Sequence, residues 1–213
     1  MTSPVVGIIL NGGVARRMGG YDKGSFRLGG RMLVEHVIDR IRGQVDTLIL
    51  NVAAGAPGGV NGGERSDAHL ALPMVPDSCR GQLGPLAGIL TGLEWARAVV
   101  PECEWVVSVP VDTPFLPLDL VERLQEALRS EQVEMALASS AGRQHPVIAL
   151  WPVNSASALR EALLKDGVRK MGEWVSRWRV AELVYEEDSV DPFFNINCPA
   201  DLEMAETLLM ETI

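Results

Sequence analysis

The sequence predicts a three-layer, Rossmann-like α/β fold in which helices cover both faces of a mostly parallel central sheet. Short, continuously apolar runs rich in β-branched residues, such as "VVGIIL" at residues 5–10, are typical of strands that a parallel sheet buries on both faces. These runs alternate with amphipathic helical stretches, and that alternation implies right-handed crossovers between strands. A chain of 213 residues suffices for one such unit, so we expect a single domain over residues 1–213.

The first half of the chain supplies strands and helices in alternation. A glycine-rich loop follows the first strand. In "RMLVEHVIDRIRG" apolar residues recur at helical spacing, and Gly43 is a suitable stop for the helix. The runs "TLILNVA" and "LPMVP" predict further strands, separated by a glycine-rich surface loop over residues 53–67. The next helix, "PLAGILTGLEWARAVV", begins with Pro85, because proline suits a first helical turn.

The second half continues this pattern less regularly. "WVVSVPV" predicts a strand that ends at "DTPFLP", and "LDLVERLQEALRS" predicts an amphipathic helix. "VEMALAS" and "PVIALW" predict two strands around "SAGRQH", as a hairpin-like excursion over the half that carries the glycine-rich loop. Two helical stretches follow. "FFNINCPADLEMAETLLM" then predicts a short strand that runs into a final helix.

Composition excludes several classes of function. The formal net charge of −9 argues against nonspecific attraction to nucleic acid or to an anionic membrane, so we expect neither as a partner. The three cysteines, Cys79, Cys103 and Cys198, include no CxxC pair and favour neither a disulfide framework nor a metal knuckle. No apolar run approaches membrane-spanning length. We therefore expect a cytoplasmic protein.

The loop "LNGGVARRMGGYDKG", residues 10–24, is the first candidate site. A loop that leaves a parallel strand lies at the carboxyl edge of the sheet, where doubly wound folds bind ligands. Its glycines let backbone N–H groups approach an anion, and Arg16, Arg17 and Lys23 add positive charge that suits a polyphosphate. The spacing matches neither a Walker A loop nor G-x-G-x-x-G. A glycine-rich turn with solvated cations is the alternative interpretation.

Polar residues also follow other expected strands. Asp112 emerges at the same sheet edge, where a carboxylate oxygen suits Mg²⁺, although "DTP" is also good turn chemistry. Asp77 precedes a loop and is equally a turn residue or a ligand contact. Asn51 closes a strand, which Asn commonly does for structural reasons alone.

The last candidates lie in the second half. Asn195 and Asn197 alternate along an expected strand, which puts both amides on one face, and capping of the following helix is the alternative. His145 stands before a proline, where a surface turn residue is the simpler interpretation. Trp174 and Trp178 are four residues apart and favour a core stripe.

The glycine-rich loop resembles the signature L-x-G-G-x-S-x-R-M-G-x-D-K of nucleotidyltransferases related to the sugar-nucleotide pyrophosphorylases, and most closely that of the molybdenum cofactor guanylyltransferases. The matching residues are Leu10, Gly12, Gly13, Arg17, Met18, Gly19, Asp22 and Lys23, with Gly20 as one extra residue. Asn11 stands in place of the usual Ala, and Ala15 in place of the usual Ser, whose hydroxyl is a possible phosphate contact in the family.

This resemblance implies a nucleotidyltransferase fold and the transfer of GMP from GTP to molybdopterin, or molybdenum cofactor, with release of pyrophosphate and with Mg²⁺ as cofactor. It implies catalytic roles for Arg17, Lys23 and Asp112, with Asp112 as the metal ligand. The residues implied on the nucleotide side are Leu10, Asn11, Gly12, Gly13, Arg17, Lys23, Asn51, Asp77 and Asp112. Those implied on the acceptor side are Gly84, Pro85, His145, Asn195 and Asn197. Transient contact with proteins that deliver or receive the cofactor is a further implied interaction.

Related activities remain as alternatives. A cytidylyltransferase or a sugar-phosphate nucleotidyltransferase would use the same loop and the same Asp112, and a regulator could bind the nucleotide without turnover. The resembled family carries Gly at position 12, whereas its cytidylyl relatives usually carry Ala there. Because the missing Cβ of Gly12 leaves room for a purine, we expect guanine.

Overall fold

The computed structural model describes residues 3–11, 14–15, 21–53, 70–81, 83–130, 132–186 and 190–211. The strands of its central sheet are β1 (Val5–Asn11), β6 (Thr47–Val52), β7 (Met74–Pro76), β8 (Trp105–Pro110), β9 (Met135–Ser140), β10 (Arg143–Pro152) and β11 (Val180–Tyr185). Two small ribbons are formed by β2 (Val14–Ala15) with β3 (Tyr21–Asp22) and by β4 (Arg27–Leu28) with β5 (Arg31–Met32).

The α-helices of the described ranges are α1 (Leu33–Ile41), α2 (Pro85–Val99), α3 (Leu120–Ser130), α4 (Ala156–Leu164), α5 (Met171–Val175) and α6 (Pro199–Glu211). Short 3-10 turns cover Lys23–Ser25, Arg42–Gln44 and Val153–Ser155. Among these residues, none of the helices combines the length and the apolar character needed to cross a membrane.

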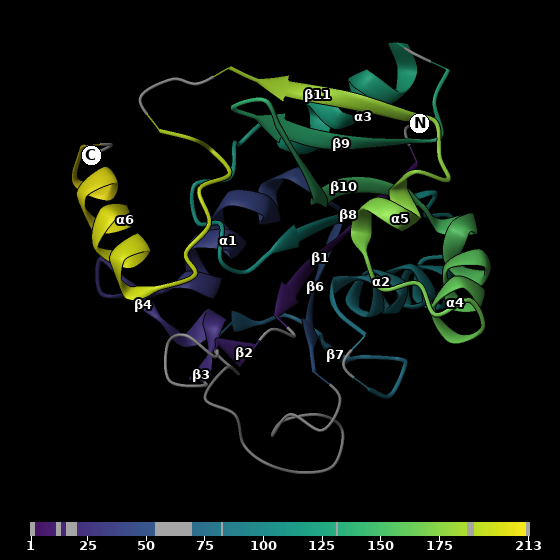
Figure 1. Ribbon diagram of the computed structural model, residues 1–213, viewed down its shortest axis with the longest axis horizontal. Coiled ribbons are helices and arrows are strands. Elements are labelled where there is room, and N and C mark those ends of the chain that lie inside the picture. Colours follow the sequence, from purple (N-terminus) through teal and green to yellow (C-terminus); the bar gives the residue numbers. More distant parts are fainter. Residues whose placement is uncertain are drawn as a thin grey trace.

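The central sheet has seven strands in the order β11-β9-β10-β8-β1-β6-β7 (Figure 1). All its pairings are parallel except the two that β10 makes with β8 and β9. The predicted mostly parallel α/β fold is therefore confirmed. β1 lies in the interior of the sheet, which explains why its sequence is apolar on both faces.

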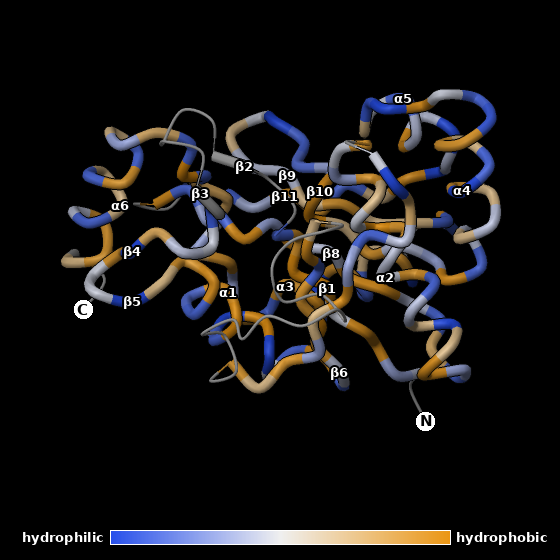
Figure 2. The backbone as a smooth tube through the Cα atoms, turned by 90° about the horizontal axis from the view of Figure 1, so that it is seen from below, coloured by the Kyte–Doolittle hydropathy of each residue, from blue (hydrophilic) through white to orange (hydrophobic). Residues whose placement is uncertain are grey.

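Alternate residues of β1 feed two separate cores. Ile9 points into a core that it shares with Val37 of α1 and Leu124 of α3. Ile8 belongs to a second core on the other face, which Leu90 of α2 joins together with residues of α4 and α5. Figure 2 shows the hydrophobic strands in the middle of the molecule. Helices on both faces of the sheet thus complete the three predicted layers.

Two expectations about the second half need correction, and one strand was missed. The β9–β10 hairpin is part of the central sheet rather than an excursion over the first half, because β10 also pairs with β8. The edge strand β11 was not expected from the sequence, and it is only half buried. The expected strand over residues 193–197 is irregular backbone, although the Ile196 N–H donates to the Asp112 carbonyl at 2.9 Å.

A third, smaller core attaches the carboxyl-terminal helix. Its buried residues are Leu28, Leu33, Phe115, Ile196 and Ala205. Ala205 lies on α6, whereas the others come from β4, from the start of α1 and from the segments that follow β8 and β11. This packing holds the segment before α6 against the edge of the sheet where β8 ends.

Helix α2 approaches the sheet closely through two glycines. A Cβ at Gly92 would lie 2.8 Å from Cδ1 of Ile8 and 3.3 Å from Cβ of Ile8, which is inflexible. A Cβ at Gly88 would lie 2.5 Å from Oδ1 of Asn51 and 2.7 Å from Cδ2 of Leu10. The absence of side chains at these two positions therefore sets the distance between α2 and the sheet.

We predict that Gly92→Ala lowers the free energy of unfolding by about 1–2 kcal/mol, because overpacking outweighs the better helix propensity of Ala. The measurement is urea denaturation of the purified proteins. Gly172→Ala in α5 is the matched control, since a Cβ there meets nothing within 4 Å. A Gly92→Ala variant as stable as the wild type would contradict the close packing of α2.

Candidate active site

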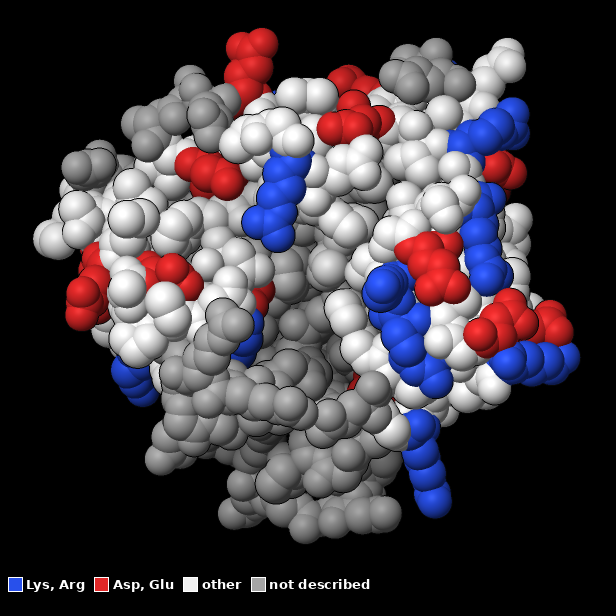
Figure 3. Space-filling model, viewed as in Figure 1, with Lys and Arg blue, Asp and Glu red and all other residues white. Residues whose placement is uncertain are grey.

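The carboxyl ends of the parallel strands bring many of the predicted residues to one edge of the sheet. Asn11 ends β1, Asn51 lies near the end of β6, Asp77 follows β7, and Asp112 follows β8. In the space-filling view the molecule is hollowed between the lobe with α6 and the lobe with α4 and α5, over the ends of β1 and β8 (Figure 3). This hollowed edge is where a doubly wound fold binds its ligands.

Lys23, Asp112 and Asn197 meet at this edge although they are far apart in the sequence. The Lys23 ammonium donates to Oδ2 of Asp112 at 2.6 Å and to Oδ1 of Asn197 at 2.7 Å. The side chain of Asp112 is only 9% exposed, and a buried carboxylate of this kind is stabilised by pairing with a cation such as Lys23. Its other oxygen, Oδ1, is buried without a hydrogen-bond partner among the described residues. The cluster therefore contains the Lys23 ammonium held in place and one carboxylate oxygen of Asp112 that is buried and makes no hydrogen bond to the described residues.

The start of α6 positions Asn197. Asp201, in the first turn of α6, accepts hydrogen bonds from the backbone N–H groups of Asn197 at 2.7 Å and Cys198 at 2.9 Å. These hydrogen bonds lower the pKa of Asp201, and the one from the Asn197 N–H has the largest effect. Asp201 thus caps the helix, and it fixes the backbone of Asn197, whose side-chain oxygen accepts from Lys23.

Asn195 does not join this cluster. Its backbone carbonyl accepts a long 3.5 Å hydrogen bond from Nδ2 of Asn197, and its side chain is exposed without a hydrogen bond to the described residues. The expectation that both amides share one face was wrong, because it required a regular strand in this segment.

Asn51 and Asp77 form a second polar pair on the other side of β1. Nδ2 of Asn51 donates to Oδ1 of Asp77 at 2.9 Å and to the Val75 carbonyl at 3.3 Å. Partial burial raises the pKa of Asp77 above its ordinary 3.8, while the hydrogen bond from Asn51 acts in the opposite direction. Two of the residues predicted on the nucleotide side, Asn51 and Asp77, are therefore in direct contact.

The loop that carries Asp77 is held by residues that the sequence did not reveal. The Ser78 N–H donates to Oγ1 of Thr91 at 2.9 Å. Arg160 of α4 makes a two-point ion pair with Glu94 of α2, at 2.6 and 2.7 Å, and also reaches Oγ of Ser78 at 3.4 Å. Ser78, Thr91, Glu94 and Arg160 lie too far apart in the sequence for a local motif to indicate that they are in contact.

Gly84 and Pro85 lie where the chain returns from this loop to α2. Gly84 has a positive φ of 73°, a backbone conformation that favours glycine, and Pro85 is the first residue of the helix. Both are exposed. Their acceptor-side role stays a prediction.

His145 lies at the same edge near the start of β10. Its Nε2 is 2.9 Å from Oγ of Ser140, and its ring lies 5.0 Å from that of Phe193 between centroids. Burial is the main reason why the pKa of His145 is lowered. The simple surface-turn interpretation of this histidine is therefore wrong.

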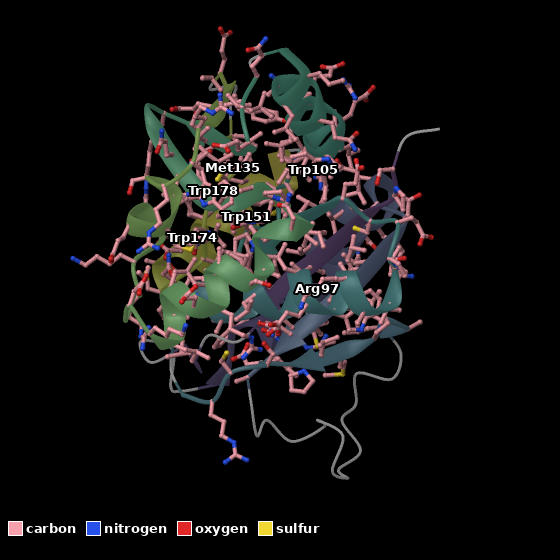
Figure 4. The ribbon with its side chains drawn as sticks, turned by 90° about the vertical axis from the view of Figure 1, so that its right-hand side faces the viewer. Arg97, Trp105, Met135, Trp151, Trp174 and Trp178 are labelled. Carbon is pink, nitrogen blue, oxygen red and sulfur yellow. The ribbon has the colours of Figure 1, made fainter. Side chains whose placement is uncertain are left out.

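The tryptophan pair is structural. Trp174 is 2% exposed, and its ring contacts Trp178 edge-on with centroids 5.5 Å apart. Figure 4 shows both beside Trp151, in the core between the sheet and α5. The core-stripe interpretation is confirmed.

A separate cavity of about 510 Å³ opens at the amino edge of the sheet, opposite the polar cluster. Its walls include Trp105, Pro152 and Trp178. None of the predicted site residues within the described ranges lines it. The chemistry of the carboxyl edge, rather than cavity size, identifies the candidate site.

Part of the glycine-rich loop lies outside the described residues. This applies to Gly12, Gly13, Arg16 and Arg17. Their expected contacts with the nucleotide stay predictions, and Lys23 is the cation of this loop whose position is described.

The lysine–carboxylate pair and the strand-end amides lie together at the carboxyl edge of a mostly parallel sheet, where doubly wound α/β proteins bind their ligands. The family model described as the MobA-like NTP transferase domain matches residues 7–180 of the chain. The molybdenum cofactor guanylyltransferase of Rhodopseudomonas palustris (strain BisB5) is 45% identical over 203 residues, 95% of this chain and 93% of the relative. The chain therefore belongs to the MobA-like NTP transferase family.

Solved structures share the fold at lower identity. The molybdopterin-guanine dinucleotide biosynthesis protein A of Archaeoglobus fulgidus has a TM-score of 0.72 and 23% identity, over 97% of this chain and 99% of that chain. The 4-diphosphocytidyl-2C-methyl-D-erythritol synthase of Anaerococcus prevotii has a TM-score of 0.68 and 14% identity, over 98% of this chain and 96% of that chain. Because these two names refer to different bases, the fold alone does not determine the nucleotide.

We predict that Asp77→Asn makes the protein more stable at pH 7.5, and that this gain shrinks towards pH 4.5. Because the pKa of Asp77 is raised in the folded protein, the protonated carboxyl stabilises the fold fully below the unfolded value of 3.8. This stabilisation is lost as the pH rises through the folded pKa, and Asn, which does not ionise, avoids that loss. Urea denaturation at both pH values measures the difference.

Asp201→Asn is the control with the opposite sign. The lowered pKa of Asp201 gives a contribution that is present above 3.8 and is lost as the pH falls through the folded pKa. If both variants shifted stability in the same direction at pH 7.5, the contrast between their environments would be refuted.

Proposed function

We propose that this protein transfers GMP from GTP to molybdopterin, releases pyrophosphate, and thereby forms a guanine dinucleotide cofactor. The observation that carries the proposal is the meeting of Lys23, Asp112 and Asn197, because residues that the family resemblance implies converge on one point from three distant parts of the chain. The relationship to a protein named molybdenum cofactor guanylyltransferase, at 45% identity, supports the choice of substrates. The three free cysteines suit the reducing cytoplasm, in which we place the reaction and its transient contacts with cofactor-carrying proteins.

Magnesium is part of the proposal. Mg²⁺ is usually held by one or two carboxylates together with substrate phosphates and water, so a site with a single carboxylate is sufficient. Asp112 fits this role, since its buried Oδ1 has no partner among the described residues. When bound there, the ion would supply neutralisation of phosphate charge.

The chain's own residues then provide position and charge. The acceptor phosphate attacks the α-phosphorus of GTP in line, the bond to the β-phosphate oxygen breaks, and pyrophosphate leaves. A phosphate monoester is largely ionised near neutral pH, so it requires no general base. Lys23 balances charge on the triphosphate, together with Arg17 of the glycine-rich loop. Acceleration arises from alignment and electrostatic stabilisation.

The two sides of the site divide the substrates. We assign Asn51 and Asp77 to the nucleotide and His145 and Asn197 to the acceptor. Their positions along the carboxyl edge support this division, because Asn51 and Asp77 lie towards β7 whereas His145 lies beyond β8.

We predict that Asp112→Asn lowers the turnover number at least about a hundredfold, because loss of one charge-stabilising contact costs on the order of 3 kcal/mol. Pyrophosphate release with GTP and molybdopterin is the measurement, with circular dichroism as the test of folding.

Asp39→Asn is the matched control. Arg31 and Asp39 also form a 2.6 Å ion pair, but both side chains are at least half exposed. This variant should keep normal turnover, since an exposed pair contributes little. Near-normal turnover of a folded Asp112→Asn protein would overturn the metal assignment.

We predict that GTP is used at least about a hundredfold better than CTP or ATP, because a site that hydrogen-bonds a base rejects analogues that leave its polar groups unpaired. Competition between nucleotides in the same turnover assay measures this ratio. Gly12→Ala should reduce the preference by narrowing the space for a purine. Efficient use of CTP by the wild type would instead favour a cytidylyltransferase.

A further inference from the structure

Three polar side chains form a chain of hydrogen bonds beside the proposed acceptor side. Ser140, the last residue of β9, donates its hydroxyl proton to Oδ1 of Asp191 at 2.7 Å. Oγ of Ser140 also lies 2.9 Å from Nε2 of His145. Ser140 is fully buried, so its hydroxyl depends on these two partners.

The direction of these hydrogen bonds determines where the proton of the imidazole ring lies. A hydroxyl has one proton, and a carboxylate can only accept. Since the Ser140 proton is used for Asp191, the Ser140 oxygen must accept from His145, and Nε2 must carry a proton. The other nitrogen of the neutral ring, Nδ1, then has a lone pair. It makes no hydrogen bond with any residue that the structure describes.

We propose that Ser140 and Asp191 are positioning residues that hold His145 as the Nε2–H tautomer, so that its Nδ1 accepts a hydrogen bond from an N–H group of the pterin acceptor. This inference rests on the proposed function, and it adds which part of the acceptor His145 recognises. A neutral Nδ1 cannot donate to phosphate oxygens, whereas the amino and ring N–H groups of a pterin are donors. His145 therefore hydrogen-bonds the pterin ring, and other residues bind the phosphate.

The charges around His145 support a neutral ring. Burial is the largest influence and lowers the pKa of His145, and the positive charge of Arg143 acts in the same direction. The negative charge of Asp191 opposes both. Because the net shift is downward from 6.5, the ring is mostly neutral at pH 7.5.

Packing fixes the ring as well as its proton. Phe193 contacts the His145 ring, and its own backbone N–H donates to Oδ1 of Asp191 at 2.9 Å. Tyr185 packs edge-on against Phe193, with centroids 5.2 Å apart. The same segment continues to Asn197, which contacts Lys23. The stretch from Asp191 to Asn197 therefore connects His145, which we propose binds the pterin, with Lys23, which we propose binds phosphate.

Nitrogen NMR of ¹⁵N-histidine-labelled protein tests the tautomer without any substrate. The chain has three histidines, and His145→Gln assigns the signal. His36 provides an internal reference, because its Nε2 must donate to the Leu28 carbonyl at 2.9 Å. At pH 7.5 we expect a protonated Nε2 and an unprotonated Nδ1 for His145. A protonated Nδ1 would overturn the inference.

Substitutions then test the cause. Ser140→Ala and Asp191→Ala should give a mixture of His145 tautomers. Ser139→Ala is the matched control, since Ser139 is a buried neighbour whose hydroxyl bonds only the Leu183 carbonyl within the described chain, at 3.5 Å. An unchanged His145 tautomer in both Ser140→Ala and Asp191→Ala would contradict the positioning role. If either variant fails to fold, the wild-type spectrum remains decisive.

Kinetics test the ligand. His145→Leu should raise the KM for molybdopterin about three- to tenfold, as for loss of one hydrogen bond, and should leave the KM for GTP unchanged. His145→Gln should restore most of the loss, because its amide can donate to Ser140 and present a carbonyl oxygen as acceptor. Free pterin should inhibit the wild type more than His145→Leu, whereas inorganic phosphate should inhibit both equally.

An unchanged KM for molybdopterin in His145→Leu would refute the contact with the pterin. If the wild type released no pyrophosphate with any pterin acceptor, the proposed function would fail, and the pterin contact would fail with it. The NMR result would still decide the tautomer independently.

Discussion

The ion pair between Lys23 and Asp112 is the interaction on which the rest of the site depends. It joins the end of the glycine-rich loop to the end of β8, and Asn197 binds the same ammonium from the start of α6. A nearly buried carboxylate is costly unless it is paired, and the ammonium of Lys23 supplies that pairing for Asp112. Because Lys23 uses Oδ2, the buried Oδ1 is left as the open oxygen. The arrangement therefore places, side by side, an ammonium group and a carboxylate oxygen that is unpaired within the described chain.

Two connections extend from this ion pair. On one side, β1 separates it from Asn51 and Asp77, whose loop is held by Thr91, Glu94 and Arg160. On the other side lies the segment from Asp191 to Asn197. It begins at Asp191, which is hydrogen-bonded through Ser140 to His145, and it ends at Asn197, which binds Lys23. Within that segment the Ile196 N–H donates to the Asp112 carbonyl at 2.9 Å, which attaches the segment to the residue that follows β8.

The sequence predicted the sheet and the strand-end residues because both follow from local patterns. Apolar runs mark buried strands, and parallel strands place Asn51, Asp77 and Asp112 at one edge by geometry alone. It did not predict the Ser140–Asp191 or Glu94–Arg160 contacts, whose partners are 51 and 66 residues apart. The error at Asn195 arose because a strand-like pattern belongs to a segment that tertiary packing holds in an irregular conformation.

We propose that this site moves the α-phosphate of GTP, together with its nucleoside, to a pterin phosphate. Radiolabelled GTP tests it most directly, with label in either the α- or the γ-phosphate and with molybdopterin as acceptor. If this proposal holds, the α-label appears in the pterin product and the γ-label in pyrophosphate. Recovery of the α-label in GDP, or only in unreacted GTP, would contradict it.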